Sequence, residues 1–420
     1  MQEAAIDAIT KPEDVILISP TGSGKTLAFL LPLLNLLRQD VREVQVLILV
    51  PSRELALQIE QVFKLMGTEF KISCCYGGHS VSVEKNNLLQ APAVLVGTPG
   101  RIAHHMDHKH VSTDKISVLI LDEFDKSLDA GFEQEMSFII SQLKNVQKRV
   151  LTSATSLKEI PAFVGLKKTN RLDFTGTHQQ GKTGLTIKSV TATGIDKMDA
   201  LLLLIGKLGS KSKIIFCNHR DAVERISEQL KKLKIAHGIY HGGLDQIDRE
   251  KVLIKLKNGS INLLVSTDLA SRGLDIPEIE AIIHYQLPTT EEVMIHRNGR
   301  TARMNASGTA YFLLKETDHL PPFLKVIPEI ELLPEKLSIP QASEWQTLYI
   351  AAGKKDKVNK MDIVGMLLKK GGLQKEELGK IEVLDYSAYA AIKSDKIRRT
   401  LQLIQNERIK NKKVKFEIST

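Results

Sequence analysis

A glycine-rich segment near the start of the chain has the composition of a phosphate-binding loop. Residues 19–26 have the sequence SPTGSGKT, which follows the apolar run VILIS and precedes a helical pattern. Backbone N–H groups in such a loop surround phosphate oxygens at the positive end of a helix. A lysine there reaches the β- and γ-phosphates, and the adjacent threonine binds Mg²⁺. The strict pattern has glycine where this chain has Ser19, so a plain glycine turn is the alternative. We expect a nucleotide site formed by Thr21, Gly22, Ser23, Gly24, Lys25 and Thr26.

Carboxylates follow another apolar run, SVLIL, in the segment DEFD at residues 122–125. Ligands of open parallel sheets bind at the carboxyl ends of the strands, so this segment is expected beside the glycine-rich loop. Asp122 suits Mg²⁺ bound through water, and Glu123 suits the base that orients an attacking water. An isolated acidic cluster is usually a solvated turn. Its pairing with an upstream phosphate loop favours nucleotide hydrolysis.

The elements that position these residues alternate between short apolar runs and helical patterns. The runs are VILIS, QVLILV, VLVGT, SVLILD and RVLTSAT in the first part, and KIIFCN, HGIYH, NLLVST, AIIHYQ and TAYFLL in the second. Continuous apolar strands that alternate with helices predict a parallel sheet covered on both faces. The polar segment GTHQQGKTG at residues 176–184 separates the two parts. We therefore expect two α/β domains in tandem.

The last part of the chain predicts a different kind of domain. Five of the 14 prolines lie at residues 321–340, which indicates an extended connector. Beyond it the pattern is β-α-β-β-α-β, the split βαβ order of RRM-type RNA-binding modules, so the fold expected here is α+β. We expect domains at residues 1–175 and 184–318, a proline-rich linker at 319–343 and an RRM-like domain at 344–420.

Composition restricts the class of protein. Residues 341–420 contain 17 Lys and Arg against 10 Asp and Glu, so they carry +7 of the net charge of +9. A basic domain of this kind favours a polyanionic partner, although a basic surface that only aids solubility is the alternative. The three cysteines show no metal-ligand spacing or disulfide framework. Apolar runs are much shorter than ~20 residues, so we expect a cytoplasmic protein without membrane contact.

Further motifs resemble those of the DEAD-box branch of the superfamily-two RNA helicases, in the same order and spacing. They are PSRELA at 51–56, GG at 77–78, TPGR at 98–101, SAT at 153–155, QIDR at 246–249, STDLASRGLD at 266–275 and HRNGRTAR at 296–303. The resemblance covers nearly the whole chain and implies two RecA-like domains that hydrolyse ATP with Mg²⁺ when RNA is bound. Unwinding is expected to be local.

The resemblance also implies roles for individual residues. Gln2 and Asp275 would help to bind ATP, and Arg300 and Arg303 would act with Lys25 and Glu123 in catalysis by meeting the γ-phosphate. A guanidinium in that place is worth ~10³ to 10⁵ in rate. The coupling of hydrolysis to movement would involve Ser153, Thr155, Asp125 and His296. RNA phosphate and ribose would contact Arg53, Gly78, Thr98, Arg101, Arg220, Arg249 and Thr267.

The chain departs from the family pattern in two notable places. Phe124 stands where the family has alanine, and because this position carries no catalytic atom we expect repacking without loss of activity. The family's aromatic residue upstream of the adenine-reading glutamine has no counterpart before Gln2. We expect either that the true start lies further upstream or that adenine stacking is weaker.

The C-terminal segment, from LYIAAGKKDK onward, resembles the RNA-binding domain of the DbpA-like bacterial DEAD-box proteins. That resemblance implies a large-subunit (23S) ribosomal RNA hairpin and its adjacent duplex as the partner, and a role on pre-ribosomal particles as a monomer. The basic loop with Lys354, Lys355 and Lys357 is expected to contact RNA. Tyr349 and Tyr389 are candidates for base stacking, with packing as the alternative for Tyr389.

Two other functions stay open on the sequence alone. One is a DNA helicase or translocase of the same superfamily, which the motif series and the RRM-like domain oppose. The other is a nucleotide-gated RNA-binding clamp with little unwinding, which the presence of Lys25, Glu123 and Arg300 opposes.

Overall fold

Central strands in the first part of the chain, such as residues 46–49 and 118–121, are apolar at every position because both faces of their sheet are covered. The computed structural model describes residues 1–20, 22–78, 81–155, 159–174, 184–271, 276–302, 307–324, 327–410 and 412–419. The chain divides into two compact units, mainly residues 1–183 and mainly residues 184–420. Every helix among the described residues is too short or too polar to span a bilayer.

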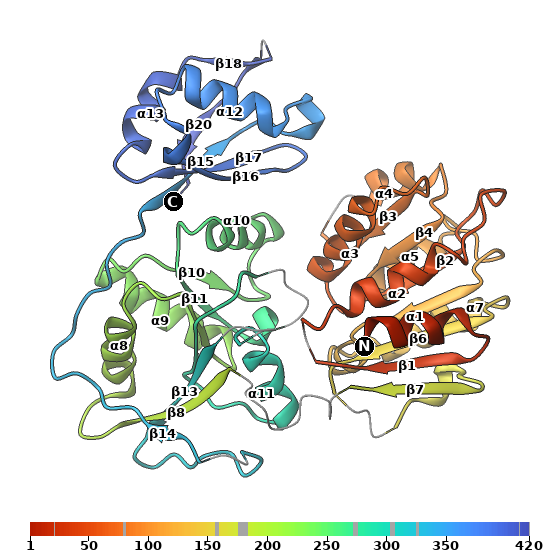
Figure 1. Cartoon of the computed structure of the whole chain (residues 1–420), viewed down its shortest axis with the longest axis horizontal. Helices are drawn as coiled ribbons and strands as arrows, with labels where there is room; N and C mark the ends of the chain where they lie inside the picture. The colour runs from red at the N-terminus through yellow and green to blue at the C-terminus, as the bar shows by residue number, and fades with distance from the viewer. Residues whose placement is uncertain are drawn as a thin grey trace. The chain divides into compact units, whose positions relative to one another are not determined.

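The first unit is a parallel sheet with the strand order β3-β4-β2-β5-β6-β1-β7 (Figure 1). Its strands are β1 (Asp14–Ile18), β2 (Val46–Leu49), β3 (Ile72–Cys75), β4 (Val94–Gly97), β5 (Val118–Leu121), β6 (Lys148–Ser153) and β7 (Thr169–Asp173). Its helices are α1 (Gln2–Thr10), α2 (Lys25–Leu33), α3 (Arg53–Leu65), α4 (Val81–Leu88), α5 (Pro99–Asp107), α6 (Phe124–Asp129), α7 (Glu133–Gln142) and the 3₁₀ turn η1 (Ala162–Val164).

Alternate residues of the central strands in this sheet point into different apolar cores. On β2, Val46 and Ile48 pack with α1, α2 and α3 in one cluster. Leu47 and Leu49 pack with α5, α6 and α7 in a second cluster on the opposite face. Because successive strand residues point to opposite faces, a fully apolar strand is the expected sequence for a sheet with helices on both sides.

The second unit contains another parallel sheet, with the order β10-β11-β9-β12-β13-β8-β14. Its strands are β8 (Leu185–Ala192), β9 (Lys213–Phe216), β10 (Gly238–Tyr240), β11 (Leu263–Ser266), β12 (Ala281–His284), β13 (Gly308–Lys315) and β14 (Glu329–Ile330). Its helices are α8 (Lys197–Leu208), α9 (Arg220–Lys232), α10 (Gln246–Lys257), the 3₁₀ turn η2 (Asp268–Ser271) and α11 (Glu291–Asn298).

The last part of the second unit is an antiparallel sheet with the order β16-β17-β15-β20. Its strands are β15 (Trp345–Ile350), β16 (Leu378–Val383), β17 (Ala388–Lys393) and β20 (Phe416–Ile418), with a hairpin of β18 (Arg408–Ile409) and β19 (Lys412–Lys413). Its helices are α12 (Lys360–Lys369) and α13 (Ile397–Ile404), with the 3₁₀ turns η3 (Lys354–Asp356) and η4 (Lys375–Glu377). The two parallel sheets and this α+β module confirm the predicted fold class.

Two details differ from the expectation. The segment expected as linker contributes β14, which pairs with β8, and Glu331 in this segment forms an ion pair with Lys188 at 2.6 Å. The hairpin of β18 and β19 interrupts the expected passage from α13 to the last strand. Proline density predicted the absence of helix in the linker, but pairing to a distant strand leaves no local sequence signal.

Candidate functional site

The glycine-rich loop lies between β1 and α2, as the sequence predicts. Gly24 precedes the first residue of α2 with a φ of 87°, a left-handed conformation that glycine adopts without strain. Lys25 is buried, and its Nζ donates to the carbonyl oxygens of Ser19 and, at 3.0 Å, Pro20. The lysine therefore lies over the loop that is expected to hold phosphate.

Gln2, at the start of α1, reaches the same loop. Its Nε2 donates to the Gly24 carbonyl at 3.3 Å, and a Cβ at Gly24 would lie only 2.3 Å from that nitrogen. Gly22 and Ser23 lie in the turn before Gly24, and Thr26 follows Lys25 in α2. The predicted ATP residues of this unit are thus adjacent, apart from Thr21, which lies outside the described residues.

The acidic pair follows β5 and is buried. Glu123 has a φ of 48°, a left-handed conformation that costs a non-glycine residue free energy and is concentrated at functional sites. Its backbone N–H donates to Asp122 Oδ1 at 3.1 Å and to Thr152 Oγ1 at 3.2 Å. The Thr152 hydroxyl donates in turn to Asp122 Oδ1. Thr152, at 0% exposure, was not among the predicted site residues.

The Asp122 carboxylate has the chemistry of a cation ligand. Burial raises its pKa above the usual 3.8, against the opposing effects of the Thr152 hydrogen bond and the Lys25 ammonium. Burial disfavours the charged form of a carboxylate, so a nearby divalent ion would stabilise that form. Asp122 and the Thr26 hydroxyl are hard oxygen donors of the kind that Mg²⁺ prefers. The residues present therefore fit the ion.

The SAT motif at the end of β6, predicted to couple hydrolysis to movement, contacts the acidic motif through one of its two hydroxyls. Thr155 Oγ1 donates to Asp125 Oδ2 at 3.2 Å. Ser153 instead closes a local turn, because its hydroxyl donates to the Thr155 carbonyl at 2.6 Å and accepts from the Thr155 N–H at 3.1 Å. Phe124 is fully buried in the apolar cluster beneath the sheet, so the residue that replaces the family's alanine is packed in the core.

The predicted RNA residues of the first unit lie along the β3-β4-β2 half of the same sheet edge. A Cβ at Gly78 would lie 2.3 Å from Arg53 Nη1, so the guanidinium lies against the glycine pair. Thr98 precedes α5 and is buried. Arg101 Nε lies 3.5 Å from the buried carboxylate of Glu84. Strand order thus separates these residues from the predicted ATP, metal and coupling residues that follow β1, β5 and β6.

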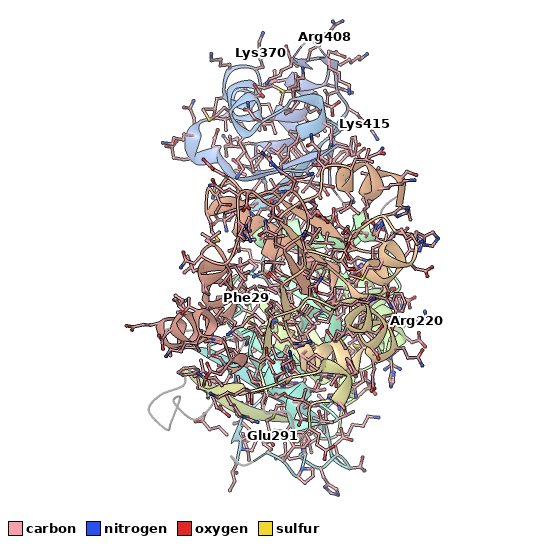
Figure 2. All side chains as sticks on the ribbon, turned by 90° about the vertical axis from the view of Figure 1, so that its right-hand side faces the viewer. Phe29, Arg220, Glu291, Lys370, Arg408 and Lys415 are labelled. Carbon is pink, nitrogen blue, oxygen red and sulfur yellow. The ribbon has the colours of Figure 1, made fainter. Side chains whose placement is uncertain are left out.

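In the second parallel sheet, three predicted RNA residues follow the strands of the β10-β11-β9 half. Arg220, which Figure 2 labels, begins α9, and its side chain is 73% exposed. Thr267 follows β11, and its N–H donates to the Tyr240 carbonyl at 3.2 Å. Arg249 lies on α10 and is mostly buried. Along the chain, Arg220 comes after β9, Arg249 after β10 and Thr267 after β11.

The arginine-rich motif of α11 contains a structural arginine that the sequence pattern did not single out. Arg297 is fully buried, and its Nε pairs with Asp268 at 2.5 Å. Its two terminal nitrogens donate to the Gln286 carbonyl at 2.8 Å and to Asn218 Oδ1 at 2.7 Å. Arg297 therefore joins the ends of β9, β11 and β12.

The other members of that motif are placed as follows. Arg300 is 2% exposed just beyond α11, and His296 is 3% exposed within it. Arg303 lies outside the described residues, as does Asp275 of the STDLASRGLD motif. The catalytic roles of both arginines stay predictions.

The C-terminal module presents its basic loop to solvent. Lys354, Lys355 and Lys357 are exposed in and after η3, and the backbone N–H groups of Lys354 and Lys355 donate to the carbonyls of Leu384 and Asp385, each at 2.8 Å. Tyr389 is 4% exposed, and its ring centroid lies 5.4 Å from that of Tyr349. This geometry favours packing for Tyr389. Figure 2 labels further exposed cations of this module: Lys370, Arg408 and Lys415.

Comparison with known families matches three successive parts of the chain. Residues 1–162 match the family described as DEAD/DEAH box helicase, residues 196–305 the helicase conserved C-terminal domain, and residues 347–418 the DbpA RNA binding domain. The three matches fall on the first sheet, the second sheet and the antiparallel module.

Individual relatives agree with these matches. The chain is 30% identical to the ATP-dependent RNA helicase DbpA of Bacillus subtilis, over 99% of this chain and 93% of the relative. It is 31% identical to DbpA of Escherichia coli, over 98% and 92%. A solved structure of Saccharomyces cerevisiae Dbp5 bound to RNA and ADP BeF₃ superimposes with a TM-score of 0.67, at 29% identity, and covers 76% of this chain and 83% of that chain. The chain therefore belongs to the DEAD-box family of ATP-dependent RNA helicases, in its DbpA type with a C-terminal RNA-binding domain.

Proposed function

We propose that this RNA helicase remodels structured large-subunit (23S) ribosomal RNA during ribosome assembly. The observation that carries the proposal is the C-terminal module, which matches the DbpA RNA binding domain and exposes a lysine-rich loop. The proposal includes action as a monomer in the cytoplasm, on a ribosomal RNA hairpin and its adjacent duplex within pre-ribosomal particles.

The proposed roles in hydrolysis rest on the buried cluster after β5. Glu123 orients the attacking water, and Lys25 binds the β- and γ-phosphates. Mg²⁺ would be held by Thr26 and, through water, by Asp122, where it neutralises charge on the phosphate oxygens. The Thr152 hydroxyl holds Asp122 and the Glu123 backbone in one arrangement.

Target choice is assigned to the C-terminal module because the residues proposed to bind RNA in the helicase core do not read bases. Core contacts such as Arg53 and Arg101 are suited to phosphate and ribose, and such contacts fix position without reading sequence. The module carries a net charge of +7 over residues 341–420, and its loop cations would add phosphate contacts at a defined place. RNA that the module holds would then be presented to the core.

The test compares RNA-stimulated ATP hydrolysis by ribosomal RNA fragments and by unrelated RNA of equal length. We expect the wild-type chain to prefer a large-subunit hairpin fragment. The triple variant Lys354→Gln, Lys355→Gln, Lys357→Gln should lose most of this preference while its stimulation by unrelated RNA stays the same. Its affinity for the hairpin should also depend less on salt. The slope of log affinity against log salt concentration should become shallower by about 0.7 to 0.9 for each phosphate that the variant no longer neutralises.

A matched control removes the same charge from the other end of α12. Lys369, Lys370 and Lys375 are exposed there, and their replacement by glutamine should leave the hairpin preference intact. An equal loss of hairpin preference in the two triple variants would show a general charge effect and contradict the proposed role of the loop. Equal stimulation of the wild-type chain by both RNAs would contradict the ribosomal target.

A further inference from the structure

Four histidines lie within seven residues at the C-terminal end of α5, in the sequence HHMDHKH. They are His104, His105, His108 and His110, and the proposed hydrolysis and RNA contacts use none of them. Their rings are close together: ring centroids are 4.1 Å apart for His104 and His108, 5.3 Å for His105 and His110, and 5.8 Å for His108 and His110. Imidazole is a common ligand of Zn²⁺, Cu²⁺ and Ni²⁺, and short histidine-rich segments are typical of metal binding.

One pair in this histidine cluster has the separation that a shared metal ion requires. Nδ1 of His105 lies 3.1 Å from Nδ1 of His110. Two imidazole nitrogens bound to one tetrahedral Zn²⁺, each at ~2.0–2.1 Å, lie roughly 3.3 Å apart. An N–H···N hydrogen bond would have a similar length. The metal titration described below therefore distinguishes a metal pair from a hydrogen bond.

The contact of the other ring nitrogen of His105 leaves Nδ1 available as a metal ligand. Its Nε2 lies 2.8 Å from Oε2 of Glu84, which is itself buried. A carboxylate oxygen accepts a hydrogen bond from an imidazole N–H, so this contact assigns the donor role to Nε2 and directs Nδ1 toward His110. A carboxylate that orients a ligating histidine in this way is the usual outer shell of protein zinc sites.

A different group, Cys75, Glu84 and His105, also places three potential ligand atoms within 4.8 Å of one another. Glu84 is already engaged there, because Oε1 accepts from the Tyr76 N–H at 2.9 Å and Oε2 faces both His105 and, at 3.5 Å, Arg101 Nε. An ion at this place would have to displace a guanidinium from a buried carboxylate. Glu84 therefore serves better as the outer partner of His105 than as a ligand.

We propose that the histidine cluster binds one divalent transition-metal ion, with Zn²⁺ as the physiological candidate. Nδ1 of His105 and Nδ1 of His110 form the prearranged pair. Exposed His108 or half-buried His104 would supply a third imidazole by rotation of its side chain, since their ring centroids lie 5.8 Å and 6.5 Å from that of His110. Water completes the tetrahedron. Mg²⁺ prefers oxygen ligands, so the nucleotide's ion does not compete for this site.

The test measures metal binding by the full-length chain after removal of any polyhistidine tag. Zn²⁺ is titrated in competition with a chromophoric chelator, and Co²⁺ is titrated alone as a spectroscopic probe. We expect one Zn²⁺ per chain and the intense visible absorption of tetrahedral Co²⁺. His110→Asn, a change at a half-buried position, should weaken Zn²⁺ binding by more than about tenfold. The double variant His104→Asn, His108→Asn should also weaken it.

Control variants distinguish this histidine cluster from metal binding elsewhere in the chain. His319→Asn alters an exposed histidine outside α5 and should leave binding unchanged. RNA-stimulated ATP hydrolysis by His110→Asn reports that the variant is folded. Binding that survives in His110→Asn, or that is lost in Cys75→Ser, would overturn the proposal in favour of another site. Octahedral Co²⁺ spectra, or no Zn²⁺ bound when it is equimolar with the chain, would also overturn it.

Discussion

At the scale of residues, the hydrolytic site depends on contacts outside the recognisable motifs. The left-handed backbone of Glu123 costs of order 1–3 kcal/mol and persists only where surrounding contacts hold it. The Thr152 hydroxyl and the Asp122 carboxylate both accept from the Glu123 N–H. A buried threonine one residue before the coupling motif thus positions the acidic pair.

Replacing Glu123 with glutamine should separate hydrolysis from binding. The amide keeps the size of the side chain but cannot act as a base, so RNA-stimulated kcat should fall by about 10² to 10⁴. RNA affinity in the presence of ATP should be unchanged. The measurements are steady-state phosphate release and equilibrium RNA binding, with Glu133→Gln at an exposed position of α7 as the control. Undiminished phosphate release would exclude Glu123 as the base.

Replacing Thr152 with valine should slow hydrolysis without affecting the fold of the sheet. Valine fills the same buried volume but offers no hydroxyl to Asp122 or to the Glu123 N–H. Hydrogen bonds to charged groups contribute about 1.5–3 kcal/mol, so kcat/KM for ATP should fall by roughly 10- to 100-fold. Thr152→Ser restores the hydroxyl and should recover most of the activity. If the serine variant is as slow as the valine variant, packing and not hydrogen bonding is responsible.

At the scale of elements, the order of strands determines which residues meet. The loop after β1, the acidic pair after β5 and the SAT motif at the end of β6 lie at neighbouring positions because β5, β6 and β1 are adjacent strands in the sheet. Lys25 and Asp122 belong to segments that are far apart along the chain. Parallel strands bring their carboxyl ends to one edge, so residues that follow neighbouring strands become neighbours.

The second parallel sheet contains a buried histidine that predicts a pH dependence of stability. His284 ends β12, where its ring stacks on Phe312 at 4.6 Å between centroids and its Nε2 lies 2.9 Å from Asn298 Oδ1. Burial, together with the nearby Arg297, lowers the pKa of His284 from 6.5 to about 3. The unfolded chain therefore binds a proton below pH 6.5 that the folded domain does not bind.

The contribution of His284 to the free energy of unfolding is therefore fully present above pH 6.5 and is lost as the pH falls toward 3. For a single group the loss should approach, and not exceed, about 1.4 kcal/mol per pH unit. Hydrogen exchange of the β12 and β13 amides measures this loss of stability. The exchange is compared at about pH 7 and about pH 5 after correction for intrinsic rates. His284→Gln should flatten this dependence, whereas His319→Gln should not. An unaltered slope in His284→Gln would assign the effect to other groups.

At the scale of the whole molecule, net positive charge is concentrated in the C-terminal module, while the residues proposed for hydrolysis lie in the parallel-sheet domains. This division predicts that the two activities can be separated. A chain that ends at Pro340 should retain ATP hydrolysis stimulated by unrelated RNA and lose its preference for ribosomal RNA fragments. The comparison uses both RNAs at equal length and at two salt concentrations, because phosphate contacts make affinity depend on salt. A retained preference in the shortened chain would place target recognition in the core.

Much of the fold and part of the candidate site followed from the sequence. Fully apolar runs such as residues 46–49 predicted buried parallel strands, and SPTGSGKT predicted the loop that Lys25 and Gln2 share. Thr152, Glu84 and Arg297 could not be predicted in the same way. Each has a partner between 21 and 79 residues away, such as His105 for Glu84 or Asn218 for Arg297, and a lone polar residue has no periodic signal.

The amino-acid sequence by itself determined the family, the alternation of strands and helices, the separate basic module and the identity of most candidate residues. These features are local: apolar periodicity, glycine at tight turns and charge along the chain are set by neighbouring residues. Only the tertiary structure decided that Thr152 braces the acidic pair, that Tyr389 packs on Tyr349, and that Glu84 contacts His105 of the histidine cluster. Strand order and side-chain packing bring such groups together across long separations, and short-range sequence patterns do not encode those distances.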